Sequence, residues 1–524
     1  MSYSAAQRAP SDSGPLAYKW KVLISVIFGI FMVILDSTVV NVAFQTLRRE
    51  YGASLNESQW IISVYVLALG IGTPLAGYLA DRYSLKRVYI AGLSLFVVGS
   101  FLCGLAPSLW LLIAARILQG FGGGIAVPLG PALLFSAFPT NEQGKALGFF
   151  GIALVVAPAL GPILGGWLVD HDLWRWIFFI NVPIGIVGIY LASRWLRYRP
   201  TDRRPSLDVI GLIIGIVGIS SILYGASIAS DQGWGSTQVV TMFVVGAIGL
   251  AAFSVVELFF AKEPLLDLRL FQNRVFLNAS LVGYVSVMAL FGAEFLMPIY
   301  LQALRGLTAL QAGLTLLPLA IAAGITTPTA GRLYDKIGPR PIVVFGFSIL
   351  AINTWQLSQI RADTSITWIM FLLFLRGIAL GSTVQTTLVT ALSPVPNPKI
   401  ARASSLINSS RQIVQAVGVA FLATVLASTL SPAGARVPDP DAGRRRLPPT
   451  ADRHHDAANV DPRHRGPAAR ALRASPGFER AYTVTFFFAL AALIIGAFLP
   501  GWPLKWAGRR PAGEGQSPPV PAGH

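Results

Sequence analysis

Long apolar runs recur along almost the whole chain of 524 residues. Each run approaches or exceeds the ~20 residues that an α-helix needs to cross the hydrocarbon core of a membrane. None shows the ~10-residue alternation of transmembrane β-strands. We therefore predict an all-α polytopic membrane protein with fourteen spanning helices. The runs cover residues 21–43, 60–80, 88–106, 109–136, 145–169, 176–196, 207–229, 237–259, 276–300, 311–331, 341–359, 366–389, 404–430 and 481–500.

The composition supports a membrane chain and argues against soluble classes. Only 12% of the residues are charged and the mean hydropathy is +0.61, whereas a soluble globular chain carries about 25% charged residues. The net charge of +17 would suit nucleic-acid binding in a soluble protein. Here the basic residues lie mostly in short segments between the apolar runs, where they set membrane orientation. We expect a lipid bilayer as partner and no nucleic acid.

The residues that usually carry redox, metal or catalytic chemistry are scarce. Cys103 is the single cysteine, so no intramolecular disulfide or cysteine-based metal cluster is available. All five histidines lie outside the apolar runs, and no Gly-x-x-x-x-Gly-Lys-Ser/Thr loop for ATP phosphates occurs. No nucleophile–base or metal-ligand spacing stands out. We expect no metal, no ATP or other cofactor and no enzymatic activity, so that an ion or substrate gradient drives any transport.

A short charged turn occurs twice between apolar runs. Residues 77–87 read Gly-Tyr-Leu-Ala-Asp-Arg-Tyr-Ser-Leu-Lys-Arg, and residues 331–340 read Gly-Arg-Leu-Tyr-Asp-Lys-Ile-Gly-Pro-Arg. The aspartates of the two copies, at positions 81 and 335, are 254 residues apart. Two arginines inside apolar runs, Arg116 and Arg376, are 260 residues apart. Features that repeat at nearly one offset predict a duplicated membrane domain.

The duplication divides the chain into two six-helix bundles with two extra linker helices between them. Residues 431–480 are rich in Pro, Ala, Arg and Asp and poor in large apolar residues, so we expect them to be disordered. Lys and Arg gather in the loops on the side of the N-terminus. Both termini are therefore expected in the cytoplasm, with the chain in the inner (plasma) membrane. The predicted segments are an N-terminal tail (1–20), the first bundle (21–200), the linker helices (201–262), the second bundle (263–505) and a C-terminal tail (506–524).

Charged side chains inside the apolar runs are the candidates for chemistry. Asp36 lies about fifteen residues into the first run, Arg116 lies in the fourth run and Glu294 in the ninth. A charged residue within a membrane helix costs roughly 2.5–3.5 kcal/mol on insertion scales and is usually functional. We expect Asp36 to exchange protons and Arg116 to modulate it; a hydrated acid and an arginine satisfied by backbone are the alternatives. For Glu294, a proton carrier, a counter-ion for a cationic substrate and a hydrated interfacial acid are all open.

Two helices carry patterns that predict a cavity or a moving contact. The helix over 404–430 has a polar stripe at i, i+3, i+4 and i+7, which lines a cavity or hydrogen-bonds neighbouring helices. The cavity-lining candidates are Gln119, Asn408, Arg411, Gln412 and Gln415. The helix over 145–169 is rich in glycine and proline, which predicts either close packing or a kinked helix at the moving interface. Its candidates are Gly148, Pro158, Gly161, Pro162, Gly165 and Gly166.

Together these motifs resemble the major facilitator superfamily, and in particular its drug:proton antiporter branch with fourteen helices. Residues 77–87 look like the loop between its helices 2 and 3, and residues 35–43 are similar to its helix 1 motif. Residues 116–120 look like the helix 4 motif. Residues 148–166 resemble the antiporter motif of helix 5, and residues 174–183 are also similar to that branch. The resemblance covers essentially the whole chain except 1–18, 431–480 and 507–524.

The resemblance implies proton-driven export of small lipophilic, often cationic, compounds by alternating access. It implies proton coupling at Asp36 and Arg116, and a conformational latch at the two charged turns. The helix 5 motif would set which way the cavity opens, although Ala157 stands where that motif usually has glycine. The latch candidates are Gly77, Asp81, Arg82, Arg87, Asp335 and Arg340.

Two other functions fit the same fold. One is a dedicated exporter of a single metabolite, such as an antibiotic made by the same cell or a siderophore, which only a substrate panel separates from a multidrug exporter. The other is a transporter-like membrane sensor that binds without transporting; Asp36, Arg116 and the helix 5 glycines argue against it. We expect protons and a small-molecule substrate as partners, and a monomer.

Overall fold

The structure is a computed structural model that describes residues 16–198, 205–261, 263–360, 363–430 and 477–501. All regular secondary structure in these ranges is helical. The first bundle comprises α1 (Tyr18–Glu50), α2 (Leu55–Tyr83), α3 (Leu85–Leu105), α4 (Leu109–Ala137), α5 (Gln143–Asp170), α6 (Trp176–Phe179) and α7 (Asn181–Trp195). The linker helices are α8 (Val209–Gln232) and α9 (Thr237–Val255). The second bundle comprises α10 (Arg274–Ile299), α11 (Ala309–Ile337), α12 (Pro339–Ser358), α13 (Ile366–Leu392), α14 (Ile400–Leu430) and α16 (Gly477–Gly496).

Each predicted apolar run lies on a helix, and one run is broken. Within the described ranges, eleven helices are long and apolar enough to cross a membrane, and α10 and α16 carry shorter apolar segments. The run 176–196 divides into α6 and α7 at Ile180. The predicted disordered stretch, 431–480, lies outside the described residues except for its last four.

The two bundles repeat local features at one offset. A capping box begins α2, in which Ser54 and Glu57 bond each other's backbone N–H, and Thr308 and Gln311 do the same at the start of α11. Positions 54 and 308 are 254 residues apart, which is also the separation of the aspartates in the charged turns. The capping boxes therefore add a third repeated feature to the duplication.

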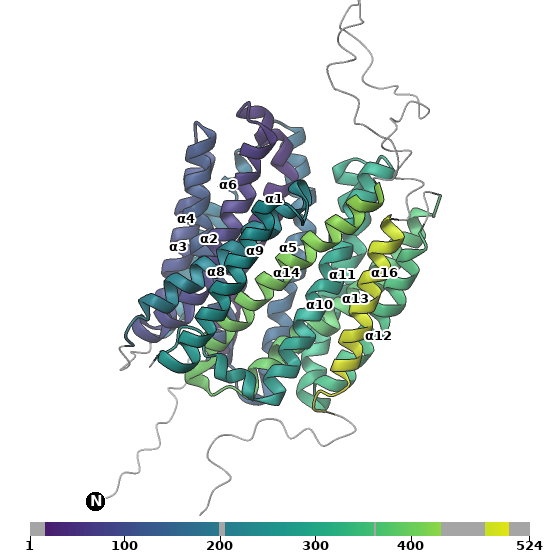
Figure 1. The fold of residues 1–524 in the computed structure, drawn as a ribbon. Helices are drawn as coiled ribbons and strands as arrows, with labels where there is room; N and C mark the ends of the chain where they lie inside the picture. The colour runs from purple at the N-terminus through teal and green to yellow at the C-terminus, as the bar shows by residue number, and fades with distance from the viewer. Residues whose placement is uncertain (1–15, 199–204, 262, 361–362, 431–476, 502–524) are drawn as a thin grey trace, which may run out of the picture.

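The bundles lie side by side and are joined most closely at one end (Figure 1). The ribbons of α1–α7 and α10–α16 come together at the lower end of the view and diverge towards the upper end. Helices α5 and α11 pack along each other, and α2 packs on α14. The charged turns at 81–84 and 335–338 lie at the lower end, which we call the latch end.

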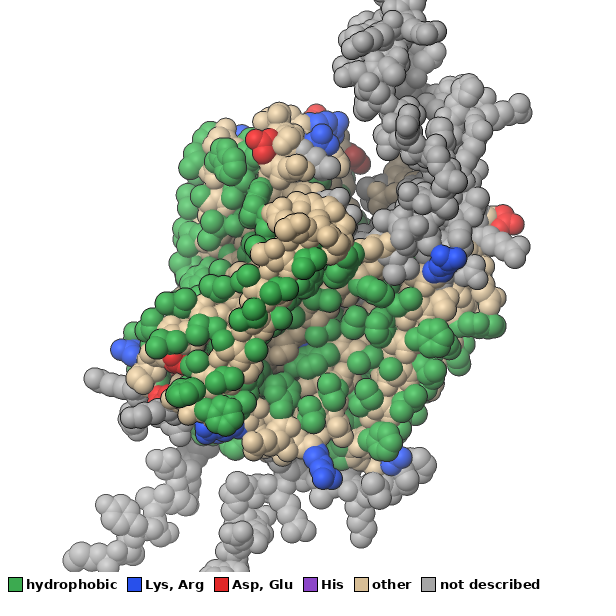
Figure 2. All heavy atoms as spheres, in the orientation of Figure 1, with side chains coloured by type: hydrophobic (Ala, Val, Ile, Leu, Met, Phe, Trp, Pro, Cys, Tyr) green, Lys and Arg blue, Asp and Glu red, His purple; other side chains and the backbone are tan. Residues whose placement is uncertain are grey.

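The surface has the polarity of a chain embedded in a bilayer. Figure 2 shows apolar side chains over the broad middle of the visible face, with most Lys, Arg, Asp and Glu side chains near the two ends. Exposed Phe, Ile, Val and Leu side chains line several helices. Such a continuous apolar belt suits lipid contact, whereas a soluble monomer rarely exposes large apolar patches.

Candidate functional site

A buried ion pair lies inside the first bundle. Nη1 of Arg116 on α4 is 2.6 Å from Oδ2 of Asp36 on α1, and the two side chains are 1% and 0% exposed. Gly120, one turn beyond Arg116, packs against the backbone of α2 at Tyr65 and leaves no room for a side chain. This close approach lets Arg116 donate from Nε to the Ile61 carbonyl at 3.2 Å and lie 3.9 Å from the Tyr65 ring centroid.

Amide side chains complete the hydrogen bonding of the Asp36 carboxylate. Its Oδ1 accepts from Nε2 of Gln119 and from Nδ2 of Asn181, both at 2.8 Å. Arg116 also donates to Oε1 of Gln119 at 2.7 Å, and Asn181 donates to Oγ of Ser100 at 3.1 Å. A buried charge pair is tolerable when its remaining atoms are hydrogen-bonded, as they are here. Protonation of Asp36 would remove the charge that holds Arg116.

Asn181 is a member of this cluster that sequence reasoning missed. It is the first residue of α7, directly after the break at Ile180, and it is fully buried. The break separates α7 from the short α6, so that Asn181 begins a new helix beside α1 and α3. The signal in the sequence was an asparagine two residues before Pro183, inside an apolar run.

The corresponding position of the second bundle holds Arg376. Its side chain is 1% exposed, and it donates to the carbonyl of Ala289 on α10 at 3.1 Å and to Oγ1 of Thr354 on α12 at 3.5 Å. Glu294 also lies on α10, but its side chain lies outside the described residues. The role predicted for Glu294 stays a prediction.

Asp81 of the first charged turn contacts the second bundle. Its Oδ2 accepts from Nε of Arg402 on α14 at 2.6 Å, and both side chains are 11% exposed. Gly77, one turn earlier on α2, lies against the backbone of Arg402. Arg402 also donates to the carbonyl of Pro264, which follows the linker helices, at 3.1 Å. Arg402 was not predicted, because its partner is 321 residues away in the sequence.

Asp335 of the second charged turn contacts the first bundle. Its two carboxylate oxygens accept from the backbone N–H groups of Gly144 and Lys145, each at 2.9 Å. These groups open α5, where a negative charge is favoured by the unpaired N–H groups and the helix dipole. Asp81 of the first bundle therefore contacts the second bundle, and Asp335 of the second bundle contacts the first, so both aspartates join the bundles at the latch end.

The three arginines predicted for the latch make other contacts. Arg82 donates to the Tyr78 hydroxyl at 3.0 Å and to the Pro205 carbonyl, ahead of α8, at 3.2 Å. Arg87 lies over the ring of Tyr198 at 4.4 Å. The backbone N–H of Arg340 donates to the carbonyl of Pro500 at 3.2 Å. Within the ranges described, none of these three side chains joins the two bundles directly.

Glycines of α5 make its two ends pack differently. At the latch end, Gly144 and Gly148 lie against Gly331 of α11 with almost no space between the backbones. Towards the other end, Gly161 packs on Thr38 and Gly165 on Val39, both of α1. The helix is continuous from Gln143 to Asp170, with Pro158 and Pro162 inside it, and Gly166 is buried. Helix α5 thus packs against α11 of the second bundle at the latch end and against α1 of its own bundle at the other end.

The predicted cavity residues divide into paired and unpaired side chains. Gln119 belongs to the Asp36 cluster. Nε2 of Gln412 donates to Oγ1 of Thr73 on α2 at 3.0 Å, which joins the two bundles, and Asn408 donates to the Ser404 carbonyl at 2.8 Å. Arg411 and Gln415 make no hydrogen bond or ion pair among the residues that the structure describes.

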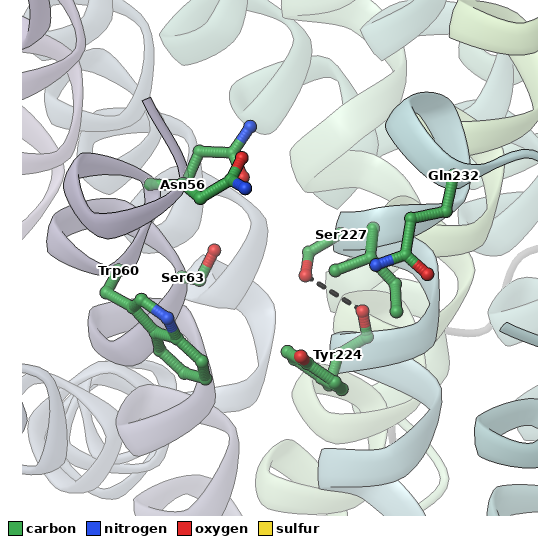
Figure 3. A pocket seen from close by; sticks show the side chains of 8 residues that line it. Asn56, Trp60, Ser63, Tyr224, Ser227 and Gln232 are labelled. Atoms are coloured by element: carbon green, nitrogen blue, oxygen red, sulfur yellow. Dashed lines mark hydrogen bonds between the residues drawn. The ribbon is translucent and has the colours of Figure 1, made fainter. Parts of the chain in front are cut away.

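A polar hollow of about 360 Å³ opens between α2 and the linker helix α8, far from the latch end (Figure 3). The rings of Trp60 and Tyr224 stack across it, with centroids 5.6 Å apart. Oγ of Ser227 donates to the Tyr224 carbonyl at 2.8 Å. Figure 3 shows Asn56, Trp60 and Ser63 facing Tyr224, Ser227 and Gln232, so a linker helix forms one wall. Within the described part of the chain, no group of three or more His, Cys, Asp or Glu could hold a metal ion.

Repeated membrane halves that meet around a central site are the usual construction of secondary transporters. The sequence matches the Major Facilitator Superfamily over residues 26–419. The multidrug export protein EmrB of Haemophilus influenzae is 33% identical over 426 residues, which cover 80% of this chain and 82% of that protein. The fatty acid resistance protein FarB of Neisseria gonorrhoeae is 33% identical over 411 residues, 78% of this chain and 81% of that protein. The crystal structure of the human organic anion transporter MFSD10 (TETRAN) matches with a TM-score of 0.61 at 14% identity, covering 91% of this chain and 99% of that one.

This chain belongs to the Major Facilitator Superfamily. The predicted fold class and the resemblance to multidrug efflux transporters of this family are confirmed. The chain is therefore a multi-pass membrane protein of a transporter family, which works in a lipid bilayer on small-molecule substrates.

Proposed function

We propose that this chain is a drug:proton antiporter, which exports small lipophilic compounds by alternating access. The observation that carries the proposal is the Asp36–Arg116 pair, sealed inside the first bundle with every oxygen of the carboxylate hydrogen-bonded. Ionisable side chains are costly to insert into a membrane interior, so their presence there usually indicates a function. A proton that neutralises the Asp36 carboxylate would remove the charge that holds the buried Arg116, so proton binding would change how α1 and α4 pack.

The contacts at the latch end define one of the two states of such a cycle. Asp81 and Asp335 close this end, while the hollow at Trp60 lies at the opposite end. With the latch end in the cytoplasm, as the Lys and Arg of the loops predict, the molecule faces outward. Proton uptake at Asp36 would loosen Arg116 and shift the balance between the two states. One proton entering down the membrane potential yields about 2.3 kcal/mol per 100 mV.

Further expectations complete the proposal. Both termini lie in the cytoplasm and the chain resides in the inner (plasma) membrane. The proton gradient is the energy source, with no ATP, other cofactor or enzymatic step, and the working unit is a monomer. The names of two relatives, a multidrug export protein and a fatty acid resistance protein, support the export of drugs and of lipophilic compounds.

Efflux from proteoliposomes with an imposed pH gradient tests the proposal. Purified protein should export a lipophilic fluorescent dye when protons can flow in the opposite direction, and the rate should fall to the protein-free background when an ionophore collapses the gradient. Added ATP should change nothing. Dye export that is independent of the gradient would contradict proton coupling, and absence of export for every compound in a broad panel would favour the sensor.

Replacing Gly331 by alanine tests whether the latch end must close and open. A β-carbon at this position would lie 2.9 Å from the Cα of Gly148 and still closer to the Gly144 carbonyl. Overpacking costs typically 1–3 kcal/mol, so the closed latch end should lose at least about fivefold in population. Spin labels on either side of this end would report the distance. Gly324→Ala on the same helix is the control, because its β-carbon would meet only a Val156 methyl at 4.0 Å; equal behaviour of the two variants would contradict the prediction.

A further inference from the structure

Arg411 is a charged side chain in the membrane interior without a described partner. It lies eleven residues into α14, which at 1.5 Å per residue places it roughly 16 Å from the latch end, about halfway across a ~30 Å hydrocarbon core. Its side chain is partly buried and forms no hydrogen bond or ion pair within the described ranges.

Buried hydroxyl groups on the neighbouring helix α10 lie beside Arg411. Tyr284 on α10, which packs on α14, lies close enough to Arg411 for the two side chains to interact electrostatically. The hydroxyl of Tyr284 is buried, and Ser280 and Ser410 lie close enough to interact with it, but none of these contacts has the geometry of a hydrogen bond. The Ser280 hydroxyl is buried and unpartnered too. Buried polar groups are normally hydrogen-bonded, so an unpaired guanidinium beside poorly paired hydroxyl groups requires an explanation.

The acidic side chains of the two latch turns and of α1 are occupied elsewhere. Asp36 is held by Arg116, Asp81 by Arg402, and Asp335 by the start of α5. Glu294 lies ten residues beyond Tyr284 on α10, roughly 15 Å further along the helix. No acid among the described side chains forms an ion pair with Arg411.

We propose that Arg411, together with Tyr284 and Ser280, binds the anionic head group of a lipophilic carboxylate during transport. A guanidinium offers several donors in a fixed fork that matches a carboxylate, and hydroxyl groups supply further donors to the second oxygen. The tail would lie along the apolar side chains of α10 and α14. The inference rests on the proposed export function and names one substrate class for its central site.

The charge of Arg411 also argues against cationic and neutral substrates at this site. A cation at this depth would be repelled by an unpaired guanidinium, and Asp36, the buried carboxylate of α1, is already neutralised by Arg116. A neutral compound could accept hydrogen bonds from these groups, but it would leave the guanidinium without a counter-charge. A monoanion satisfies both the charge and the hydrogen bonds of the cluster.

Three probes that share one alkyl chain separate these classes: dodecanoate, dodecylammonium and dodecanol. Binding to the purified full-length protein in a non-ionic detergent is measured by calorimetry. We expect the wild type to bind the carboxylate at least tenfold more tightly than the ammonium. Arg411→Gln should lose at least tenfold for the carboxylate and change little for the alcohol, and Arg411→Lys should retain an intermediate affinity. Tyr284→Phe should weaken the carboxylate a few-fold.

Two controls keep the outcome interpretable. Arg269→Gln removes an exposed arginine in the segment after the linker helices and should change no affinity, and a thermal unfolding curve of each variant reports folding. Equal carboxylate affinity in Arg411→Gln, or an equal loss for all three probes, would overturn the inference. Carboxylate binding that appears only after Glu294→Gln would overturn it as well, because Glu294 would then be the partner of Arg411. Carboxylate binding without any proton-driven export would leave this site standing and reject the antiporter.

Discussion

Replacing Asp36 by asparagine is expected to reduce proton-driven efflux to the background of protein-free vesicles. The amide oxygen can still accept hydrogen bonds from Gln119 and Asn181, but the side chain no longer exchanges a proton. Arg116 loses the carboxylate that lies 2.6 Å away. Removing one member of a buried ion pair costs about 3–5 kcal/mol, so a fall in thermal stability should accompany the loss of transport.

A double variant separates the proton from the packing. In Asp36→Asn/Arg116→Gln both charges are removed, so the protein should regain most of its thermal stability while efflux stays at background. Dye efflux from proteoliposomes and thermal unfolding in detergent are measured on the same preparations. Asp170→Asn, an exposed acid at the end of α5, is the control and should match the wild type. Efflux near the wild-type rate in either Asp36 variant would reject Asp36 as the coupling site.

Reversing the charge of Arg402 is expected to open the latch end. Arg402→Asp places a second carboxylate against Asp81, where the native ion pair is 2.6 Å long and only 11% exposed on each side. Breaking this partly buried ion pair should destabilise the closed state by about 3 kcal/mol. That energy corresponds to roughly a 150-fold change in the ratio of closed to open molecules. A shift of this size stalls alternating access, which needs both states to be populated, so efflux should fall steeply.

The exchanged pair Asp81→Arg/Arg402→Asp should recover closure, because the opposite charges face each other again. The distance across the latch end can be followed with spin labels at Lys86→Cys and Lys336→Cys, since Cys103, the single native cysteine, is buried. Lys399→Gln is the matched control: its ion pair with Asp267 lies at the same end, but the lysine is 48% exposed, and such pairs contribute about 0–1 kcal/mol. An exchanged pair as open as Arg402→Asp would contradict the latch.

Much of the fold follows from local properties that a sequence displays. A run of about 20 apolar residues cannot satisfy its backbone in lipid except as a helix, which is why all fourteen runs lie on helices. The ends were predicted less well: α1 continues to Glu50, and α2 begins at Leu55, where the Ser54 capping box starts the helix in a polar setting. Helix ends depend on caps and on water, and hydropathy alone does not report them.

The sequence predicted which charged residues form the candidate sites, but it did not predict which residues they contact. Asp36 and Arg116 stood out because charge in an apolar run is costly, and the structure brings them together. Asn181 and Arg402 did not, since the sequence shows neither that a helix begins at Asn181 nor that an arginine near the start of α14 contacts the other bundle. Their partners lie 145 and 321 residues away.

The sequence by itself determined the helices, the duplication and the embedded charges, because each of these depends on neighbours along the chain or on a fixed repeat. The tertiary structure alone decided which charges are paired. In the folded chain Asn181 hydrogen-bonds to Asp36, Asp81 pairs with Arg402, and Asp335 accepts from the start of α5. Arg411 has no partner among the described residues. Pairing at 2.6–3.0 Å depends on how helices cross, and helix crossing is set by packing between segments that are distant in the sequence.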